Sequence, residues 1–329
     1  MADLTTSYMG LPLRNPILAG SSGLTRSLDG IKRCEQAGVG GVVLKSIFEE
    51  QFLLEEGAAE HAALHPEALD YIRRGGLLEY APRALTDLIE KAKKEVDLPI
   101  IASINCQSEK LWPRFARQIQ DAGADGLELN IYTMPVDLET PGAAYEDRHV
   151  QILEAVRDEV TIPVSVKLHF QITSVAHLGY RLARSGCSGL VLFNWFLRPD
   201  IDVQNLKTVA RKGKGDLFQS LRWVALLAGR VGCDVAGSGG IRTAEDVVKH
   251  VLAGAAAVQV CSLFYEKGLE QARRLCEGLE AWMAAHRYRR LEDFRGELSF
   301  KTQSLSFKDR GEAEGYLRAQ YVGAYARKE

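Results

Sequence analysis

Short apolar runs recur along the chain, and two alternating phrases introduce them. In one phrase a small residue and a glycine precede the run, as Ala37-Gly38 precedes GGVVLKS and Ala122-Gly123 precedes DGLELN. In the other a valine stands a few residues before the run, as in VDLPIIASIN and VTIPVSVKL. Glycine is typical of helix C-termini, and continuous apolar runs are typical of buried parallel strands. The pattern predicts strands that alternate with helices.

Eight such strands can be counted when residues 16–20 (PILAG) are taken as the first. Amphipathic stretches between them predict helices, for example over residues 84–96, 149–159 and 175–185. Strands alternating with helices imply a parallel sheet. Eight units imply a (β/α)₈ barrel, with a doubly wound open sheet as the alternative.

Residues 233–262 show one such unit most clearly. An apolar run leads into the turn GSGG at residues 237–240, and Thr243 with Asp246 predicts the start of a helix. Gly254 predicts its end, before a second apolar run. Consecutive N–H groups in a glycine turn can form a nest for phosphate. The alternative is a tight turn without a ligand.

Two connections are longer than simple loops, at residues 47–82 and 195–219. Both follow the C-terminal end of a strand, where barrel enzymes place their sites, so we expect them to cover the barrel mouth. The first has a partly helical pattern. We also predict a barrel over residues 1–290, followed by a C-terminal tail, 291–329, that packs on the barrel or on a partner subunit.

Polar or small residues end almost every predicted strand, directly after apolar runs. A single polar strand end is unremarkable in a solvated loop, but repeated lysines and asparagines predict a shared site. Lys167 and His169 are two residues apart and therefore face the same side of their strand. A lysine there can serve as a Schiff-base nucleophile or as a fixed positive charge. The strand-end residues are Gly20, Ser21, Ser22, Lys45, Ser46, Asn105, Asn130, Lys167, His169, Asn194, Gly239, Gly240, Cys261 and Ser262.

Composition excludes several other classes of protein. The formal net charge is −2 and 26% of residues are charged, so no basic surface indicates nucleic-acid binding. An apolar run of about 18 residues, long enough for a membrane span, does not occur. The first residues, MADLTTSYMG, lack the regions of a signal peptide. The six cysteines form no C-x-x-C motif, so we expect no metal site and a cytoplasmic protein.

Several segments together resemble the dihydroorotate dehydrogenases, which are barrels that bind flavin mononucleotide (FMN). They are NPILAGSSG, LKS, ELNI, VSVKL, VLFN and AGSGGI…LAGAAAVQV, and the resemblance covers most of residues 4–275. It implies an FMN-dependent oxidoreductase that acts on CH–CH groups in pyrimidine biosynthesis. It also implies the soluble branch of the family, a homodimer and a small-molecule substrate.

The resemblance implies roles for the residues that match the family's motifs. Gly20, Ser21 and Ser22 would line the isoalloxazine ring of FMN. Lys45 and Ser46 would lie beside the flavin and the substrate, with Lys45 among the catalytic residues.

Further matches complete the expected site. Asn105 and Asn130 would contact flavin or substrate, and Asn194 would face the substrate. Lys167 would lie near flavin N1 and O2, where positive charge stabilises the reduced anion. The phosphate would be held by backbone N–H groups of Gly239, Gly240, Cys261 and Ser262.

The sequence also departs from the family's pattern. After ELN the family has an apolar residue, a serine, the catalytic Cys or Ser, and then Pro-Asn. Here IYTMP at residues 131–135 places Thr133 at the position of the base and Pro135 at that of an asparagine. Trp195 stands where the family has a small hydroxyl residue. The asparagine-rich loop after the second strand is also missing. Thr133 would need activation by water or a neighbour such as His169.

These observations favour an FMN-dependent oxidoreductase that moves hydride from a small, dihydropyrimidine-like substrate to FMN. Thr133 would be the base, and Lys167 would stabilise the reduced flavin. One alternative is a flavin-free, phosphate-binding lyase or epimerase with Lys167 as the nucleophile. Another is a protein that binds FMN without catalysis.

Overall fold

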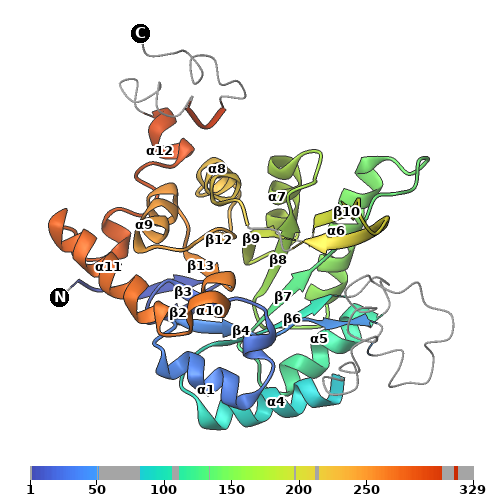
Figure 1. The fold of residues 1–329 in the computed structure, drawn as a ribbon, viewed down its shortest axis with the longest axis horizontal. Coiled ribbons are helices and arrows are strands. Elements are labelled where there is room, and N and C mark those ends of the chain that lie inside the picture. Colours follow the sequence, from blue (N-terminus) through green and yellow to red (C-terminus); the bar gives the residue numbers. More distant parts are fainter. Residues whose placement is uncertain are drawn as a thin grey trace.

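The computed structural model describes residues 2–49, 51, 82–105, 111–132, 134–195, 198–211, 215–305 and 315–317. Eight parallel strands close into a barrel, because β4 and β6, which stand at the two ends of this series of eight, also pair with each other (Figure 1). This confirms the predicted (β/α)₈ barrel and excludes the open sheet. The barrel strands are β3 (Ile17–Ala19), β4 (Gly41–Val43), β6 (Ile100–Asn105), β7 (Gly126–Asn130), β8 (Val164–His169), β9 (Gly189–Asn194), β12 (Asp234–Ser238) and β13 (Ala257–Val260).

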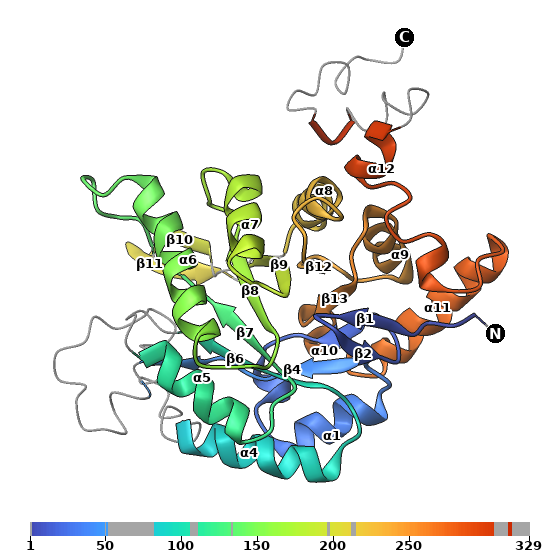
Figure 2. The ribbon, with the colours of Figure 1, turned by 180° about the vertical axis from the view of Figure 1, so that it is seen from behind.

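Helices surround the barrel and bury one face each against it (Figures 1 and 2). They are α1 (Leu28–Gln36), α4 (Pro82–Glu95), α5 (Leu111–Asp121), α6 (Gly142–Arg157), α7 (Val175–Arg184), α8 (Leu217–Leu227), α9 (Ala244–Ala253), α10 (Ser262–Lys267) and α11 (Gln271–Ala285). The three helices predicted from periodicity are present as α4, α6 and α7. Helix α6 begins at Gly142, seven residues before the predicted start, because its first turns are largely exposed and carry no apolar stripe.

Helix α9 begins and ends as the sequence predicts. The hydroxyl of Thr243 accepts from the Asp246 amide while the Asp246 carboxylate accepts from the Thr243 amide, which completes a capping box. Gly254 ends the helix in the left-handed region, with φ +109°.

A hairpin of β1 (Thr6–Tyr8) and β2 (Leu11–Leu13) closes the N-terminal end of the barrel. Its residues Tyr8 and Met9 pack with inward-facing apolar side chains such as Val191. The fit is close at Gly189, where a Cβ would lie 2.9 Å from both the Tyr8 hydroxyl and Met9 Cγ. This end of the barrel is therefore filled with apolar groups.

Inward positions change from apolar to polar toward the carboxyl ends of the strands. In β6 the apolar Ile101 is followed, at alternate positions, by Ser103 and Asn105. In β13 the inward Ala257 is followed by Gln259. Because side chains alternate along a strand, the polar residues form layers above the apolar floor.

The remaining elements are not among the eight barrel strands or the helices between them. Most of the connection 47–82, including its predicted helical part, lies outside the described residues, and its start forms a short strand beside β6. The connection 195–219 contains an antiparallel hairpin and the first turn of α8. The additional elements are β5 (Ile47–Phe48), β10 (Arg198–Asp202), β11 (Lys207–Arg211), η1 (Gly23–Thr25), η4 (Leu291–Asp293) and α12 (Phe300–Leu305).

Residues 291–305 follow the barrel and contact its outer helices. The Gly296 and Leu298 amides donate to carbonyls of Val251 and Leu252 in α9, and Phe294 is buried. Figure 1 shows α12 beyond α8 and α9. The division into a barrel and a tail at residue 290 stays a prediction. None of the helices within the described ranges has the length and apolar content needed to cross a bilayer.

Candidate active site

The carboxyl ends of the barrel strands bring together most of the residues predicted for the site. Asn105, Asn130 and Asn194 are the last residues of β6, β7 and β9. Gly20 directly follows β3, and Gly239 directly follows β12. Since parallel strands end on the same side of a barrel, these groups share one mouth.

Lys167 lies at the centre of a buried polar cluster. Its ammonium donates to Gln259 Oε1 at 2.8 Å and lies 3.5 Å from Glu128 Oε1. Gln259 Nε2 in turn donates to Glu128 Oε2. The three side chains come from β8, β13 and β7, and all are buried. The cluster places a salt-bridged positive charge in the polar layer of the barrel.

Three hydroxyl groups form a second polar chain inside the barrel. Ser21 Oγ lies 3.0 Å from Ser46 Oγ, and Ser46 Oγ lies 2.8 Å from Ser103 Oγ. The Ser46 amide also donates to Ser21 Oγ at 2.9 Å. The structure therefore joins the segments after β3 and β4, as expected if both line one ligand.

The asparagines retain unused hydrogen-bonding groups. Asn194 Nδ2 donates to Asn130 Oδ1 at 2.8 Å, which orients both amides, and within the described ranges Asn194 Oδ1 and Asn130 Nδ2 have no hydrogen-bond partner. Asn105 is buried, and its Oδ1 has no partner among the described residues. A buried polar atom without a partner is costly, so these amides suit a polar ligand.

The glycine turn after β12 packs closely against Trp195 and Gly215. Gly239 and Gly240 have φ of +104° and +76°, which favour glycine. A Cβ on Gly239 would lie 2.0 Å from Trp195 Nε1, and one on Gly215 would lie 2.6 Å from the Gly240 amide nitrogen. Among the described residues, neither the Gly239 nor the Gly240 amide has a hydrogen-bond acceptor. Two adjacent donors are therefore available to an anion.

Trp195 is held in place by two neighbours. Its indole N–H donates to the Ser238 carbonyl at 3.1 Å, and its ring stacks on Phe170 with centroids 5.1 Å apart and an interplanar angle of 24°. The indole therefore packs against the turn at Gly239, directly after the strand end at Asn194.

His169 is buried beside Tyr132 and His149. The centroid of the His169 ring lies 5.5 Å from that of the Tyr132 ring and 6.2 Å from that of the His149 ring. Burial lowers the pKa of His169 to about 4, and the His149 ring adds to the effect. The Gln171 amide donates to His169 Nδ1 at 3.2 Å, so the proton of the neutral ring is assigned to Nε2. In this tautomer the lone pair of Nδ1 is engaged by the Gln171 amide.

Other predicted residues have different surroundings. Lys45 Nζ lies 4.8 Å from the centroid of the Phe48 ring, as a cation–π contact. Gly20 approaches Cys261 so closely that a Cβ would lie 2.5 Å from its Sγ. Ser22 precedes η1, and Ser262 begins α10. Thr133 lies outside the described residues.

Sequence reasoning missed Glu128 and Gln259. Glu128 shares the otherwise apolar strand GLELN with Asn130, and Gln259 is the single polar residue of the strand AVQV. Glu128 is also two residues before Asn130, so the strand period places both on the inner face. That alternation was a usable signal for the partners of Lys167.

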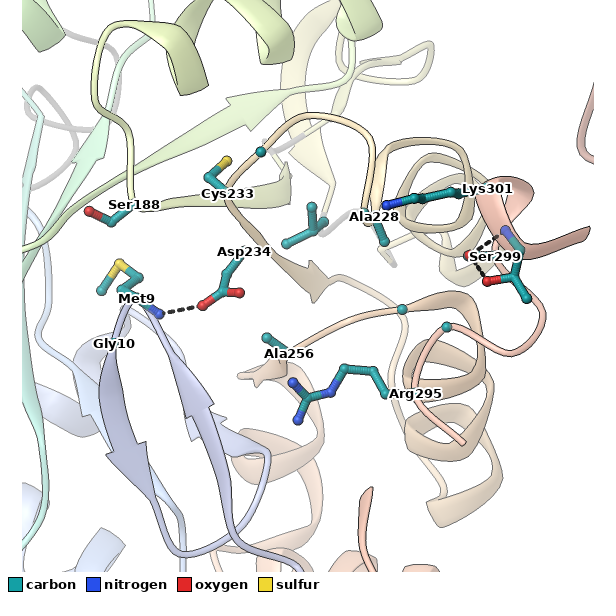
Figure 3. A pocket seen from close by; sticks show the side chains of 16 residues that line it. Met9, Gly10, Ser188, Ala228, Cys233, Asp234, Ala256, Arg295, Ser299 and Lys301 are labelled. Carbon is teal, nitrogen blue, oxygen red and sulfur yellow. Dashed lines mark hydrogen bonds between the residues drawn. The ribbon is translucent and has the colours of Figure 1, made fainter. Parts of the chain in front are cut away.

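A separate cavity of about 640 Å³ lies at the opposite end of the barrel, near the starts of β9 and β12 (Figure 3). There Asp234 accepts from the Met9 amide at 2.8 Å, and Arg295 donates to Thr6 and Glu292. Burial raises the pKa of Asp234. These contacts attach the N-terminal hairpin and the C-terminal segment to the barrel floor, which serves stability rather than chemistry in this fold.

Comparison with known proteins is consistent with this arrangement. The catalytic subunit of dihydroorotate dehydrogenase B (NAD(+)) from Pyrococcus abyssi is 26% identical over 306 residues, covering 89% of this chain and 98% of that protein. Dihydroorotate dehydrogenase A (fumarate) from Lactobacillus delbrueckii is 24% identical, covering 91% and 100%. The chloroplastic dihydropyrimidine dehydrogenase (NADP(+)) of Arabidopsis thaliana is 24% identical, covering 89% and 76%.

The sequence model of the dihydroorotate dehydrogenase family matches residues 3–283, which is most of the chain. The match spans all eight barrel strands and the polar residues at their carboxyl ends. The chain therefore belongs to the dihydroorotate dehydrogenase family and is an oxidoreductase of that family.

Proposed function

We propose that the protein is an FMN-dependent oxidoreductase that removes hydride from a CH–CH group of a small, dihydropyrimidine-like substrate. The observation that carries the proposal is the glycine turn at Gly239 and Gly240, whose two amides have no acceptor among the described residues. This turn suits a phosphate group, and it shares its end of the barrel with the buried charge of Lys167.

The residues present fit FMN in three respects. The Gly239 and Gly240 amides can bind the phosphate. Asn105 Oδ1, which is buried and has no partner among the described residues, suits a polar edge of the flavin ring. The buried ammonium of Lys167, held by Gln259 and Glu128, suits the edge of the ring that becomes anionic on reduction. A homodimer remains part of the proposal.

When bound, FMN supplies the hydride acceptor at its N5 atom. Lys167 holds a fixed positive charge close to where negative charge develops, which lowers the barrier electrostatically. Asn130 and Asn194 orient the substrate through the amide atoms that their mutual hydrogen bond leaves available. We assign the base to Thr133, with a water as the activating group in preference to His169.

The lyase alternative has less support, because it needs Lys167 as a free amine. Its nitrogen instead donates to Gln259 and pairs with Glu128. An ammonium has no lone pair with which to attack a carbonyl. Borohydride trapping of a substrate on Lys167 would reverse this preference.

Trp195 makes dihydroorotate a poor substrate in our proposal. Pro135 replaces an asparagine, and the fixed indole fills the position of a hydroxyl. Each buried polar group of the substrate left unpaired costs about 1–3 kcal/mol. Two such losses reduce the rate roughly a hundredfold or more, at about 1.36 kcal/mol per tenfold.

Anaerobic mixing of the FMN-loaded protein with dihydroorotate or dihydrouracil tests the proposal. We expect one small cyclic CH–CH substrate to bleach the flavin absorbance, and dihydroorotate to do so slowly. Trp195→Ser should accelerate the bleaching of the flavin by dihydroorotate, whereas Trp195→Phe, which keeps the stacked ring, should not. Rapid bleaching of the parent by dihydroorotate would refute the substrate assignment. A loaded protein that no such substrate bleaches would instead be an FMN-binding protein without this activity.

A further inference from the structure

A buried ion pair inside the barrel is not explained by flavin binding alone. The side chains of Glu128 and Lys167 are 1% and 7% exposed, and Gln259 is buried beside them. Removing two charges from water costs several kcal/mol for each ion, and their attraction repays this only with good geometry and further hydrogen bonds. An apolar pair would fill the same space at lower cost, so the pair calls for a functional reason.

We propose that Glu128 is a positioning residue that, through Gln259, keeps the Lys167 ammonium charged and directed at the cofactor edge. This inference rests on the proposed function, because it assumes that Lys167 acts on bound FMN. Glu128 itself contacts Lys167 and Gln259, and the proposal gives it no contact with substrate.

The hydrogen bonds of Gln259 allow only one orientation of its amide. A carboxylate can only accept and an ammonium can only donate, so Nε2 must face Glu128 and Oε1 must face Lys167. The amide contact with Lys167 is 2.8 Å, whereas the direct Lys167–Glu128 distance is 3.5 Å. Gln259 therefore fixes the direction of the ammonium, and Glu128 supplies the compensating charge.

Other titratable groups near the pair change charge at higher pH. Tyr8 lies on the hairpin below, and burial followed by the charge of Glu128 raises its pKa. Burial also raises the pKa of the Cys261 thiol at the end of β13, which senses the charges of Lys167, Glu128 and Lys45. Tyr8 and Cys261 therefore stay neutral near pH 7, so neither adds a charge beside the ion pair there.

The test measures the midpoint potential of bound FMN against pH in Glu128→Gln. Without its counter-charge, the ammonium should lose its proton more readily as the pH rises, so the potential should fall more steeply than in the parent. We expect the potential of the variant to fall by at least about 30 mV more than that of the parent, which is a tenfold change in the redox equilibrium for a two-electron couple. Glu146→Gln is the matched control, because Glu146 is also buried but accepts from the Ser174 amide.

A double-mutant cycle gives a readout that is independent of FMN. We expect the losses in thermal midpoint for Glu128→Gln and Lys167→Met to be non-additive, with the double variant losing less than the two single losses together. Glu128→Asp replaces Glu128→Gln if the amide variant does not fold.

The outcomes separate this inference from the proposed function. A parent protein that binds no FMN defeats the proposed function, whereas the cycle still tests the ion pair. If the parent holds FMN and Glu128→Gln follows the pH profile of the parent and of Glu146→Gln, the positioning role of Glu128 is overturned. Additive losses in thermal midpoint would also overturn it.

Discussion

His169 should make the stability of the protein fall in acid. The pKa of this imidazole is ordinarily 6.5 and is lowered to about 4 in the folded protein, mainly by burial. Below pH 6.5 the unfolded chain therefore binds a proton at His169 that the folded protein does not bind. Stability is present in full above pH 6.5 and declines as the pH falls toward 4. At 1.36 kcal/mol per pH unit, the loss approaches about 3 kcal/mol.

His169→Asn tests this value. The asparagine Oδ1 can replace Nδ1 as the acceptor for the Gln171 amide, so the variant removes the titration while keeping that hydrogen bond. We would measure the free energy of unfolding in urea at pH 7.5 and pH 4.5. The parent should lose about 2–3 kcal/mol more than the variant over this interval.

His177→Asn is the matched control, because His177 is exposed on α7. This variant should lose as much unfolding free energy between pH 7.5 and pH 4.5 as the parent does. Burial also lowers the pKa of His149 and His250, so only the difference between parent and variant is assigned to His169. An equal loss in parent and His169→Asn would show that His169 is not held neutral, and our account of its tautomer would fail.

Two further predictions concern the cofactor. Lys167→Met should lower the midpoint potential of bound FMN, because a charge-assisted contact contributes about 1.5–3 kcal/mol, or roughly 30–60 mV for two electrons; an unchanged potential would remove Lys167 from this role. Gly239→Ala should weaken FMN binding, because its Cβ would lie 2.0 Å from Trp195 Nε1. Gly10→Ala is the control: it also places alanine at a positive φ (+78°), but its Cβ would have no atom within 4 Å, so FMN affinity should be unchanged. Calorimetric titration with FMN distinguishes them, and equal affinities for the two variants would contradict our reading of the turn.

The architecture could be predicted from sequence because buried parallel strands leave a local signal. The barrel strands are short runs of mostly buried and largely apolar residues, and several follow a glycine that ends a helix, as Gly254 ends α9. The carboxyl end of each strand was therefore fixed to within a residue or two, and the strand-end polar residues could be grouped before any contact was known.

Features that depend on contacts between distant segments could not be predicted. The hairpin of β10 and β11 exposes Ile201 and Val203, so burial leaves no pattern there. The pairing of Glu128 with Lys167 joins β7 to β8 through Gln259 of β13, and only barrel closure brings that third strand to the same layer. The position of Trp195 likewise depends on Phe170, which follows a different strand.

The central claim is that the mouth of this barrel binds FMN. The direct measurement is to denature the purified protein, separate the supernatant by chromatography, and quantify released flavin against protein. Our account predicts non-covalent FMN at close to one molecule for each chain. If no FMN is released, and added FMN binds no more tightly than about 1 mM, near −4 kcal/mol, the proposed function is contradicted.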